Sequence, residues 1–328
     1  MPWTRAAALS VCFWLCSTAI AFQRPSDDTA VSIVPRVRMD APDAPVLPRT
    51  RLRVDSALVQ IPVHVTTPAG ASVTGLTREN FQLFEDNVQQ KIAHFAMEDA
   101  PISIGLLFDA SGSMHNKMQQ SSEAAANFFK TANADDEFFL VEFNDRPKLT
   151  VPFTPDSGEL YQRILHTRPF GRTSLLDAIH LALVHMKNAR NLRKAIVILS
   201  DGGDNRSRYT AREIKNAMLE SDVQLYAMGI FDPDESRKRT PEEQNGPQLL
   251  EELAEQSGGR LYTVDHLDDL PAISARIGNE LRNQYVLGYF STNDTRDGKY
   301  RRVKVQLLAP PQQDLRIHHR PGYHAPAE

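Results

Sequence analysis

Between Pro101 and Leu270 the sequence repeats short, continuous apolar segments, and this repetition constrains the fold more than any other feature. Such segments are typical of strands that are buried on both faces. Amphipathic stretches with helical spacing, such as Leu175–Met186, separate several of them. The apolar segments are residues 102–108, 138–141, 195–199, 223–228 and 261–264. Residues 149–151 lie between two prolines and are expected to form an edge strand. This order predicts an α/β domain over residues 101–283, with a doubly wound, mostly parallel sheet of Rossmann-like type.

Alternating apolar residues flank this domain on both sides, which is the pattern of strands with one buried face. Before the domain they are Val59, Ile61, Val63 and Val65, and after it they are Val303, Val305 and Leu307. The two flanking β segments, residues 51–98 and 284–328, are each too short to bury a stable core alone. We therefore expect them to pair into a small β-sandwich-like domain, with the α/β domain inserted between them.

The first 21 residues have the pattern of a secretory signal peptide. Arg5 precedes an apolar run over residues 6–19, and Ala19-Ile20-Ala21 supplies the small residues of a cleavage site after Ala21. An uncleaved anchor is the alternative, but the run is short for a membrane span. We expect a secreted or periplasmic protein with no membrane span after cleavage. Residues 22–50, rich in proline and aspartate, are expected to form a disordered linker.

Cys12 and Cys16 are the two cysteines of the chain, and both lie in this leader. A lipoprotein signal ending at either is disfavoured, because bulky Val11 and Leu15 precede them. A mature chain without cysteine excludes cysteine-based catalysis and cysteine-based zinc sites. The formal net charge of −4 argues against a nucleic-acid binder that depends on bulk charge.

Hydroxyl and carboxylate side chains gather where three of the predicted strands and loops end. Asp109, Ser111 and Ser113 follow the first buried strand, Thr173 precedes an amphipathic helix, and Asp201 follows a later buried strand. In an open parallel sheet, ligands bind beyond the carboxyl ends of the strands. Hard oxygen donors suit Mg²⁺, Mn²⁺ or Ca²⁺ rather than Zn²⁺ or Cu²⁺. The five residues are therefore candidate metal ligands.

These motifs, in this order, resemble the metal-ion-dependent adhesion site (MIDAS) of von Willebrand factor A domains. The resemblance is carried by Asp109-Ala110-Ser111-Gly112-Ser113, Thr173 and Ser200-Asp201-Gly202, and covers residues 102–283. More narrowly, the chain is similar to the bacterial secreted VWFA-related family. Segments typical of that family are Val73–Phe81, Gln284–Tyr289 and Arg320–Tyr323.

The resemblance implies a function and a role for each candidate residue. Ser111, Ser113 and Thr173 would bind the metal through their hydroxyls, and Asp109 and Asp201 would act directly or through water. A divalent cation, Mg²⁺ before Mn²⁺ or Ca²⁺, would then capture an aspartate or glutamate of a partner protein. The chain departs from the pattern at residue 172, where arginine stands in place of the expected glycine.

Three alternatives compete with this secreted, non-enzymatic adhesion module. The serines are common helix caps, and Thr173 with the nearby Asp177 also fits a capping arrangement. A hydrolase would use Asp109 or Ser111 as its nucleophile, with His115 as the nearby base, but the Gly-x-Ser-x-Gly elbow is absent around Ser111. A degenerate scaffold would no longer use metal, and Thr173 or Asp201 would then face away from Ser111.

Three other features have weaker assignments. The charged loop 231–246 follows a strand end and is either a solvated loop or a rim beside the metal. Asp204 and Asn205 are expected to be turn residues rather than ligands. His318, His319 and His324 lack metal-ligand spacing and are expected to be solvated.

Overall fold

The computed structural model describes residues 58–97, 99–231, 245–308 and 314–327, all within the compact unit Val54–Glu328. The predicted signal peptide (1–21) and linker (22–50) lie outside the described residues, as does most of the charged loop 231–246. Among the residues described, no helix combines the length and apolar character that crossing a membrane requires.

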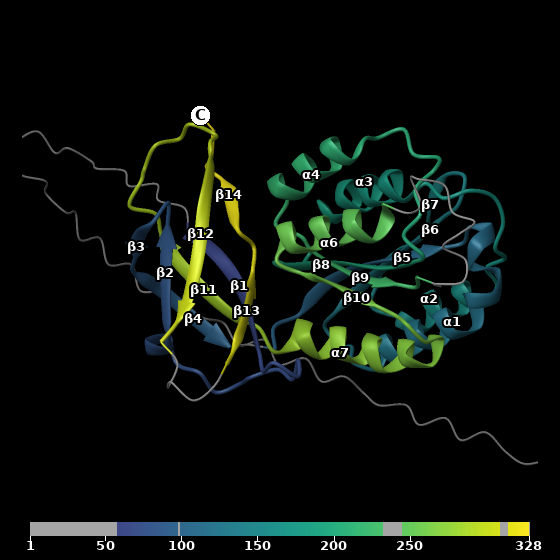
Figure 1. Cartoon of the computed structure of the whole chain (residues 1–328), viewed down its shortest axis with the longest axis horizontal. Helices are drawn as coiled ribbons and strands as arrows, with labels where there is room; N and C mark the ends of the chain where they lie inside the picture. Colours follow the sequence, from purple (N-terminus) through teal and green to yellow (C-terminus); the bar gives the residue numbers. More distant parts are fainter. Residues whose placement is uncertain (1–57, 98, 232–244, 309–313, 328) are drawn as a thin grey trace, which may run out of the picture. The chain divides into compact units, whose positions relative to one another are not determined.

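A six-stranded sheet forms the centre of the α/β part (Figure 1), in the order β10-β9-β8-β5-β6-β7. All neighbours are parallel except β7, which pairs antiparallel with β6 at one edge. The bounds are β5 (Ile102–Asp109), β6 (Glu137–Phe143), β7 (Pro147–Thr154), β8 (Arg193–Ser200), β9 (Gln224–Gly229) and β10 (Arg260–Thr263). This confirms the predicted mostly parallel sheet and the edge position of residues 149–151.

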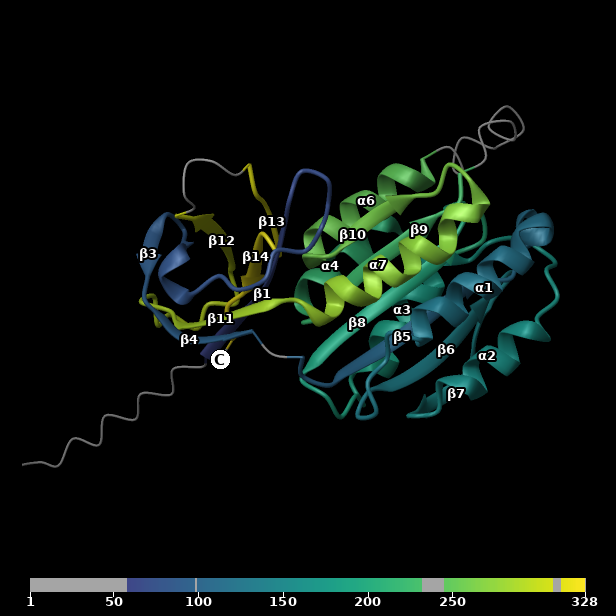
Figure 2. The same ribbon diagram turned by 90° about the horizontal axis from the view of Figure 1, so that it is seen from below.

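Helices cover both faces of this sheet, as Figures 1 and 2 show. One face carries α1 (Met118–Phe129), α2 (Ser157–Leu165) and α7 (Leu270–Arg282). The other carries α3 (Leu175–Met186), α4 (Ala211–Glu220) and α6 (Gly246–Ser257). Adjacent residues of β5 enter opposite cores, Leu106 and Phe108 one and Leu107 the other. Burial on both faces is the reason that β5 is continuously apolar. The 3₁₀ turns η2 (Gly112–Lys117) and η4 (Leu267–Asp269) precede α1 and α7.

The two flanking segments form a β-sandwich of two four-stranded sheets, in the orders β13-β1-β11-β4 and β14-β12-β2-β3. The N-terminal elements are β1 (Leu58–Thr66), η1 (Arg78–Asn80), β2 (Phe81–Glu85), β3 (Val88–Gln90) and β4 (Ile92–Met97). The C-terminal strands are β11 (Tyr285–Phe290), β12 (Tyr300–Leu307), β13 (Arg316–His319) and β14 (Gly322–His324). Strand β1 pairs with β11 and β13, and β2 pairs with β12. The expected pairing of the two segments is therefore confirmed, with one shared hydrophobic core.

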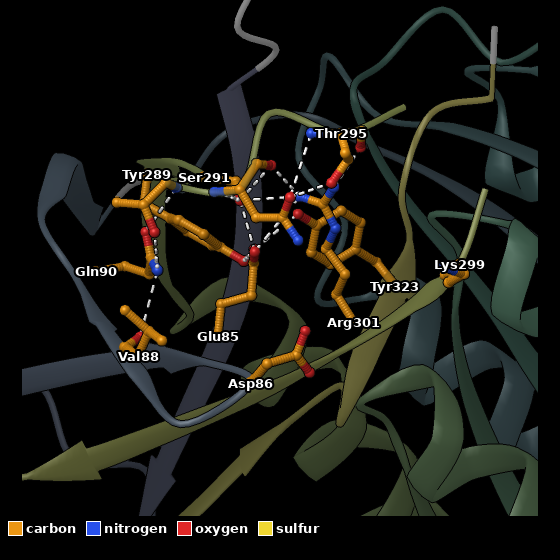
Figure 3. Close-up of polar contacts among 12 residues, drawn as sticks. Glu85, Asp86, Val88, Gln90, Tyr289, Ser291, Thr295, Lys299, Arg301 and Tyr323 are labelled. Atoms are coloured by element: carbon orange, nitrogen blue, oxygen red, sulfur yellow. Dashed lines mark hydrogen bonds and ion pairs between the residues drawn. The ribbon is translucent and has the colours of Figure 1, made fainter. Parts of the chain in front are cut away.

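A buried polar cluster joins the two sheets of this sandwich (Figure 3). Glu85 Oε2 accepts hydrogen bonds from the Tyr289 and Tyr323 hydroxyls, at 2.7 and 2.8 Å. Glu85 Oε1 accepts one from Ser291 Oγ at 2.5 Å and lies 3.4 Å from Arg301 Nη1. Burial first, and then the bond to Glu85, raises the pKa of Tyr289. Because β11 belongs to one sheet and β2, β12 and β14 to the other, these contacts hold the sheets in register.

His318 and His319 are half-buried rather than fully solvated as expected. Strand β13 lies beside β1, so His318 Nε2 is 3.4 Å from Thr66 Oγ1, and His319 Nδ1 is 2.7 Å from Arg320 O. Burial lowers the pKa of both histidines, that of His318 to about 4 with a further contribution from neighbouring positive charges. His324 is exposed, as expected.

Candidate functional site

Backbone hydrogen bonds bring the loop after β5 against the loop before α3. Gly112 N donates to Gly171 O at 3.0 Å, and Phe170 N donates to Ala110 O at 2.9 Å. Gly171 has a φ of +76°, and a Cβ added there would lie 2.7 Å from Asp145 Oδ2. A side chain at this position is thus disfavoured by both backbone strain and contact. The contact between the loops places the Asp109–Ser113 segment beside the loop that leads to Thr173. The assignment of these residues as metal ligands stays a prediction.

Asp109 is fully buried at the end of β5 and holds two neighbouring segments. Its Oδ1 accepts a hydrogen bond from Ser111 N at 2.9 Å, and its Oδ2 accepts one from Ser200 Oγ at 2.5 Å. Ser200 Oγ in turn accepts from Gly202 N at 3.0 Å. Burial, and then the nearby Asp201 carboxylate, raises the pKa of Asp109 to about 7. Both oxygens are engaged, so this carboxylate positions the site.

The two serine hydroxyls lie together. Ser111 Oγ is 3.0 Å from Ser113 Oγ, with Ser111 buried and Ser113 exposed. Ser111 occupies the N-cap position of η2, but its side chain makes no capping hydrogen bond. The capping interpretation therefore does not account for the Ser111 hydroxyl.

Thr173 is buried and is held by Asn205. Thr173 N donates to Asn205 Oδ1 at 3.0 Å, and Asn205 N donates to Thr173 O at 3.1 Å. The Asp177 carboxylate accepts from the backbone of residues 208 and 209 and does not cap with Thr173. Asp204 Oδ1 accepts from backbone N–H groups two and three residues later, which is the expected turn role. The positioning role of Asn205 was not predicted, because its partner is 32 residues away in the sequence.

Asp201 is buried after β8 and has a cationic neighbour that the sequence reasoning missed. Lys117 Nζ lies 3.4 Å from Asp201 Oδ2, and Lys117 is only 4% exposed. A lysine is almost never this buried unless it is paired. The available signal was its spacing: Lys117 follows Met114 by three residues, and both are the buried residues of η2. The roles of Ser200, Asn205 and Lys117 in the site were thus not predicted, although Ser200 and Asn205 lie in segments that the sequence analysis named.

The donor set is compatible with a small, hard divalent cation. Mg²⁺ prefers six oxygens at about 2.0–2.1 Å, which places neighbouring oxygens about 3 Å apart. The Ser111 and Ser113 hydroxyl oxygens have this separation, 3.0 Å. Within the described ranges there is no group of three or more histidine, cysteine, aspartate or glutamate side chains placed to hold a metal. A cation here would therefore depend on hydroxyl ligands, with Asp109 and Asp201 supplying the negative charge.

The hydrolase alternative requires a base beside its nucleophile. In the part of the chain that the structure describes, the hydrogen-bond partner of Ser111 Oγ is Ser113 Oγ, and no base contacts it. His115 lies in η2 and is exposed. The geometry gives the hydrolase alternative no support, and the absence of enzymatic activity stays a prediction.

Comparison with known proteins relates the stretch that contains these residues to a family. Residues 104–203, which contain all five candidate residues, match the model of the von Willebrand factor type A domain. A protein of Borreliella burgdorferi is 25% identical over 198 residues, covering 54% of this chain and 57% of that protein. The pig inter-alpha-trypsin inhibitor heavy chain H2 is 28% identical over 173 residues, covering 47% of this chain and 18% of the inhibitor chain.

The chain therefore spans less than two thirds of the length of either relative. Among solved structures, mussel byssus proximal thread matrix protein 1 with a zinc-occupied MIDAS motif is similar, with a TM-score of 0.49 and 17% identity. That match covers 61% of this chain and 50% of the mussel protein. On its family match, its sheet order and the three loops that meet at the ends of β5 and β8, this chain carries a von Willebrand factor type A domain.

Proposed function

We propose that this protein is a secreted, metal-dependent binding module that captures an acidic residue of a partner protein. The observation that carries the proposal is the pair of Ser111 and Ser113 hydroxyls, 3.0 Å apart. The buried carboxylates of Asp109 and Asp201 belong to the same site, and the loop after β5 is hydrogen-bonded to the loop before α3. A bound divalent cation would supply an electrophilic centre with a coordination position for a carboxylate oxygen. Ser111, Ser113 and Thr173 would hold it, and Asp109 and Asp201 would balance its charge.

The surface beside the site supports an acidic partner. Arg172 and Arg206 are exposed, and each is the sequence neighbour of a residue of the Thr173–Asn205 contact. Among the described residues neither guanidinium has an ion-pair partner, although the Arg172 backbone N–H donates to Asp145 Oδ1 at 3.0 Å. Phe170, 60% exposed, stands two residues before Arg172. Unpaired cations at the rim of an interface speed the association of an oppositely charged partner. Arginine at residue 172 thus favours carboxylate capture and removes none of the candidate ligands.

Calorimetric titration of Mg²⁺ and Mn²⁺ into residues 22–328 tests the metal site. We expect saturable one-site binding that is lost in Ser113→Ala, because that exposed hydroxyl is removed without disturbing a core contact. The matched control is Ser157→Ala, at the first residue of α2, which should bind like the unsubstituted chain. Absence of binding, or binding that survives Ser113→Ala and Thr173→Ala together, would contradict the assigned ligands and favour the metal-free scaffold.

A further inference from the structure

Lys117 places an amine group inside the site that is proposed to hold a cation. Its ammonium lies 3.4 Å from Asp201 Oδ2, and the residues are only 4% and 6% exposed. Asp109 is also buried, and the 2.5 Å hydrogen bond from Ser200 Oγ to Asp109 Oδ2 ties it to the residue that directly precedes Asp201. Two buried carboxylates and one ammonium carry a net charge of −1 when all are ionised. The two carboxylates alone would carry a net charge of −2, so Lys117 reduces the negative charge that attracts a divalent cation.

In the metal-free site, Lys117 compensates the negative charge of the Asp201 carboxylate. An unpaired buried carboxylate is costly, and the ammonium relieves that cost beside Asp201. The same contact opposes a divalent cation, because the like charges repel and because Asp201 is already engaged. With a divalent cation bound, the net charge of the group becomes +1. One external carboxylate brings that sum to zero.

We propose that Lys117 makes cation binding and acidic-ligand binding mutually dependent, so that neither is strong without the other. The inference rests on the proposed function and deepens it, since it names a residue, Lys117, that favours capture of a carboxylate through the metal over binding of the metal alone. By thermodynamic linkage, a carboxylate that strengthens cation binding is itself bound more tightly when the cation is present. The residue is a positioning and charge-balancing group rather than a ligand.

The competing explanation is that Lys117 only stabilises the turn between β5 and α1. In that case its loss would lower stability and would leave cation affinity unchanged or weaker. Charge competition has the opposite sign: removal of the ammonium strengthens cation binding. The two explanations are therefore separated by the direction of a change in affinity.

The test is calorimetric titration of Mn²⁺ into residues 22–328 as the unsubstituted chain and as Lys117→Met, which keeps an unbranched side chain of similar length. Each titration is made in sodium acetate and in sodium chloride of the same ionic strength, acetate being the probe for the partner carboxylate. The matched control is Lys148→Met, an exposed lysine on β7. Thermal melting of each protein with and without Mn²⁺ checks that the fold is retained.

We expect Lys117→Met to bind Mn²⁺ at least about tenfold more tightly in chloride, as loss of one close like charge in a partly buried site implies. Acetate should tighten Mn²⁺ binding to the unsubstituted chain and should have a smaller effect on Lys117→Met. Lys148→Met should match the unsubstituted chain in both salts. If Lys117→Met fails to fold, Lys117→Gln replaces it.

Two results would overturn the inference. One is a folded Lys117 variant that binds Mn²⁺ no more tightly than the unsubstituted chain, and the other is an acetate effect of equal size in both. Either would leave the proposed function intact if the unsubstituted chain still binds Mn²⁺ through Ser113. Failure of both proteins to bind Mn²⁺ would instead refute the proposed metal site itself.

Discussion

Acidification should destabilise this protein in part through His64, a buried histidine on β1. His64 lies on β1, is 1% exposed, and its Nε2 is 3.0 Å from Ser72 Oγ. Its Nδ1 is 3.4 Å from Glu280 Oε2 on α7 but makes no hydrogen bond there. Burial, with the positive charges of Arg260, His318 and Arg276, lowers the pKa of His64 to about 3. The Glu280 carboxylate does not reverse this direction, since Arg260 Nη1 also lies 3.3 Å from it.

The sign and size of this pH dependence of stability follow from the linkage between proton binding and folding. The pKa of His64 is 6.5 in the unfolded chain and about 3 in the folded protein. The neutral, buried His64 therefore contributes its full stabilisation at pH values above the unfolded pKa of 6.5. That contribution is lost as the pH falls toward about 3. At about pH 5 the unfolded histidine is protonated and the folded one is not, which lowers the free energy of unfolding by about 2 kcal/mol relative to about pH 8.

Urea unfolding from about pH 8 to about pH 5 measures this loss in the unsubstituted chain, in His64→Gln and in His94→Gln. Glutamine cannot titrate and can still bond to Ser72, so the unsubstituted chain should lose about 2 kcal/mol more than His64→Gln over this range. His94 is exposed on β4, and its variant should behave like the unsubstituted chain. The raised pKa of Glu280 contributes with the opposite sign but is common to all three proteins. Equal pH dependence in the unsubstituted chain and His64→Gln would refute the reasoning, and a stabilisation at low pH would mean that His64 ion-pairs with Glu280.

Three further predictions concern the sandwich and the site loops. Glu85→Gln should lower the free energy of unfolding by about 3 kcal/mol in urea titrations, because buried Arg301 loses its charged partner, whereas exposed Glu79→Gln should change it by less than about 0.5 kcal/mol. Gly171→Ala should weaken Mn²⁺ binding by calorimetry through strain at a φ of +76°, and an unchanged affinity would separate this loop from the site. Asn205→Ala should also weaken Mn²⁺ binding, since Thr173 N loses its acceptor; retention of full affinity would show that Thr173 is held by other contacts.

The central fold could be predicted from the sequence because the burial of a strand determines the pattern of apolar residues along it. Strands such as β5 and β8 are buried on both faces and therefore continuously apolar, while β1 alternates because one face meets the sandwich core. The candidate ligands could also be predicted, because Asp109 ends β5 and Asp201 directly follows β8, and both strands are themselves recognisable. In each case the information lies within a few neighbouring residues.

Only the tertiary structure decided which side chains, far apart in the sequence, contact each other in the site and in the sandwich. Lys117 and Asp201 are 84 residues apart, and Ser200 and Asp109 are 91 apart. Arg301 and Glu85 are separated by 216 residues, and the partial burial of His318 depends on the pairing of β13 with β1. A polar residue carries no local sign of whether its partner is water or a distant side chain, because that is settled only when the strands pack. The sequence by itself therefore determined the architecture and the candidate donor residues, and the packing of distant segments decided the charges and hydrogen bonds around those candidates.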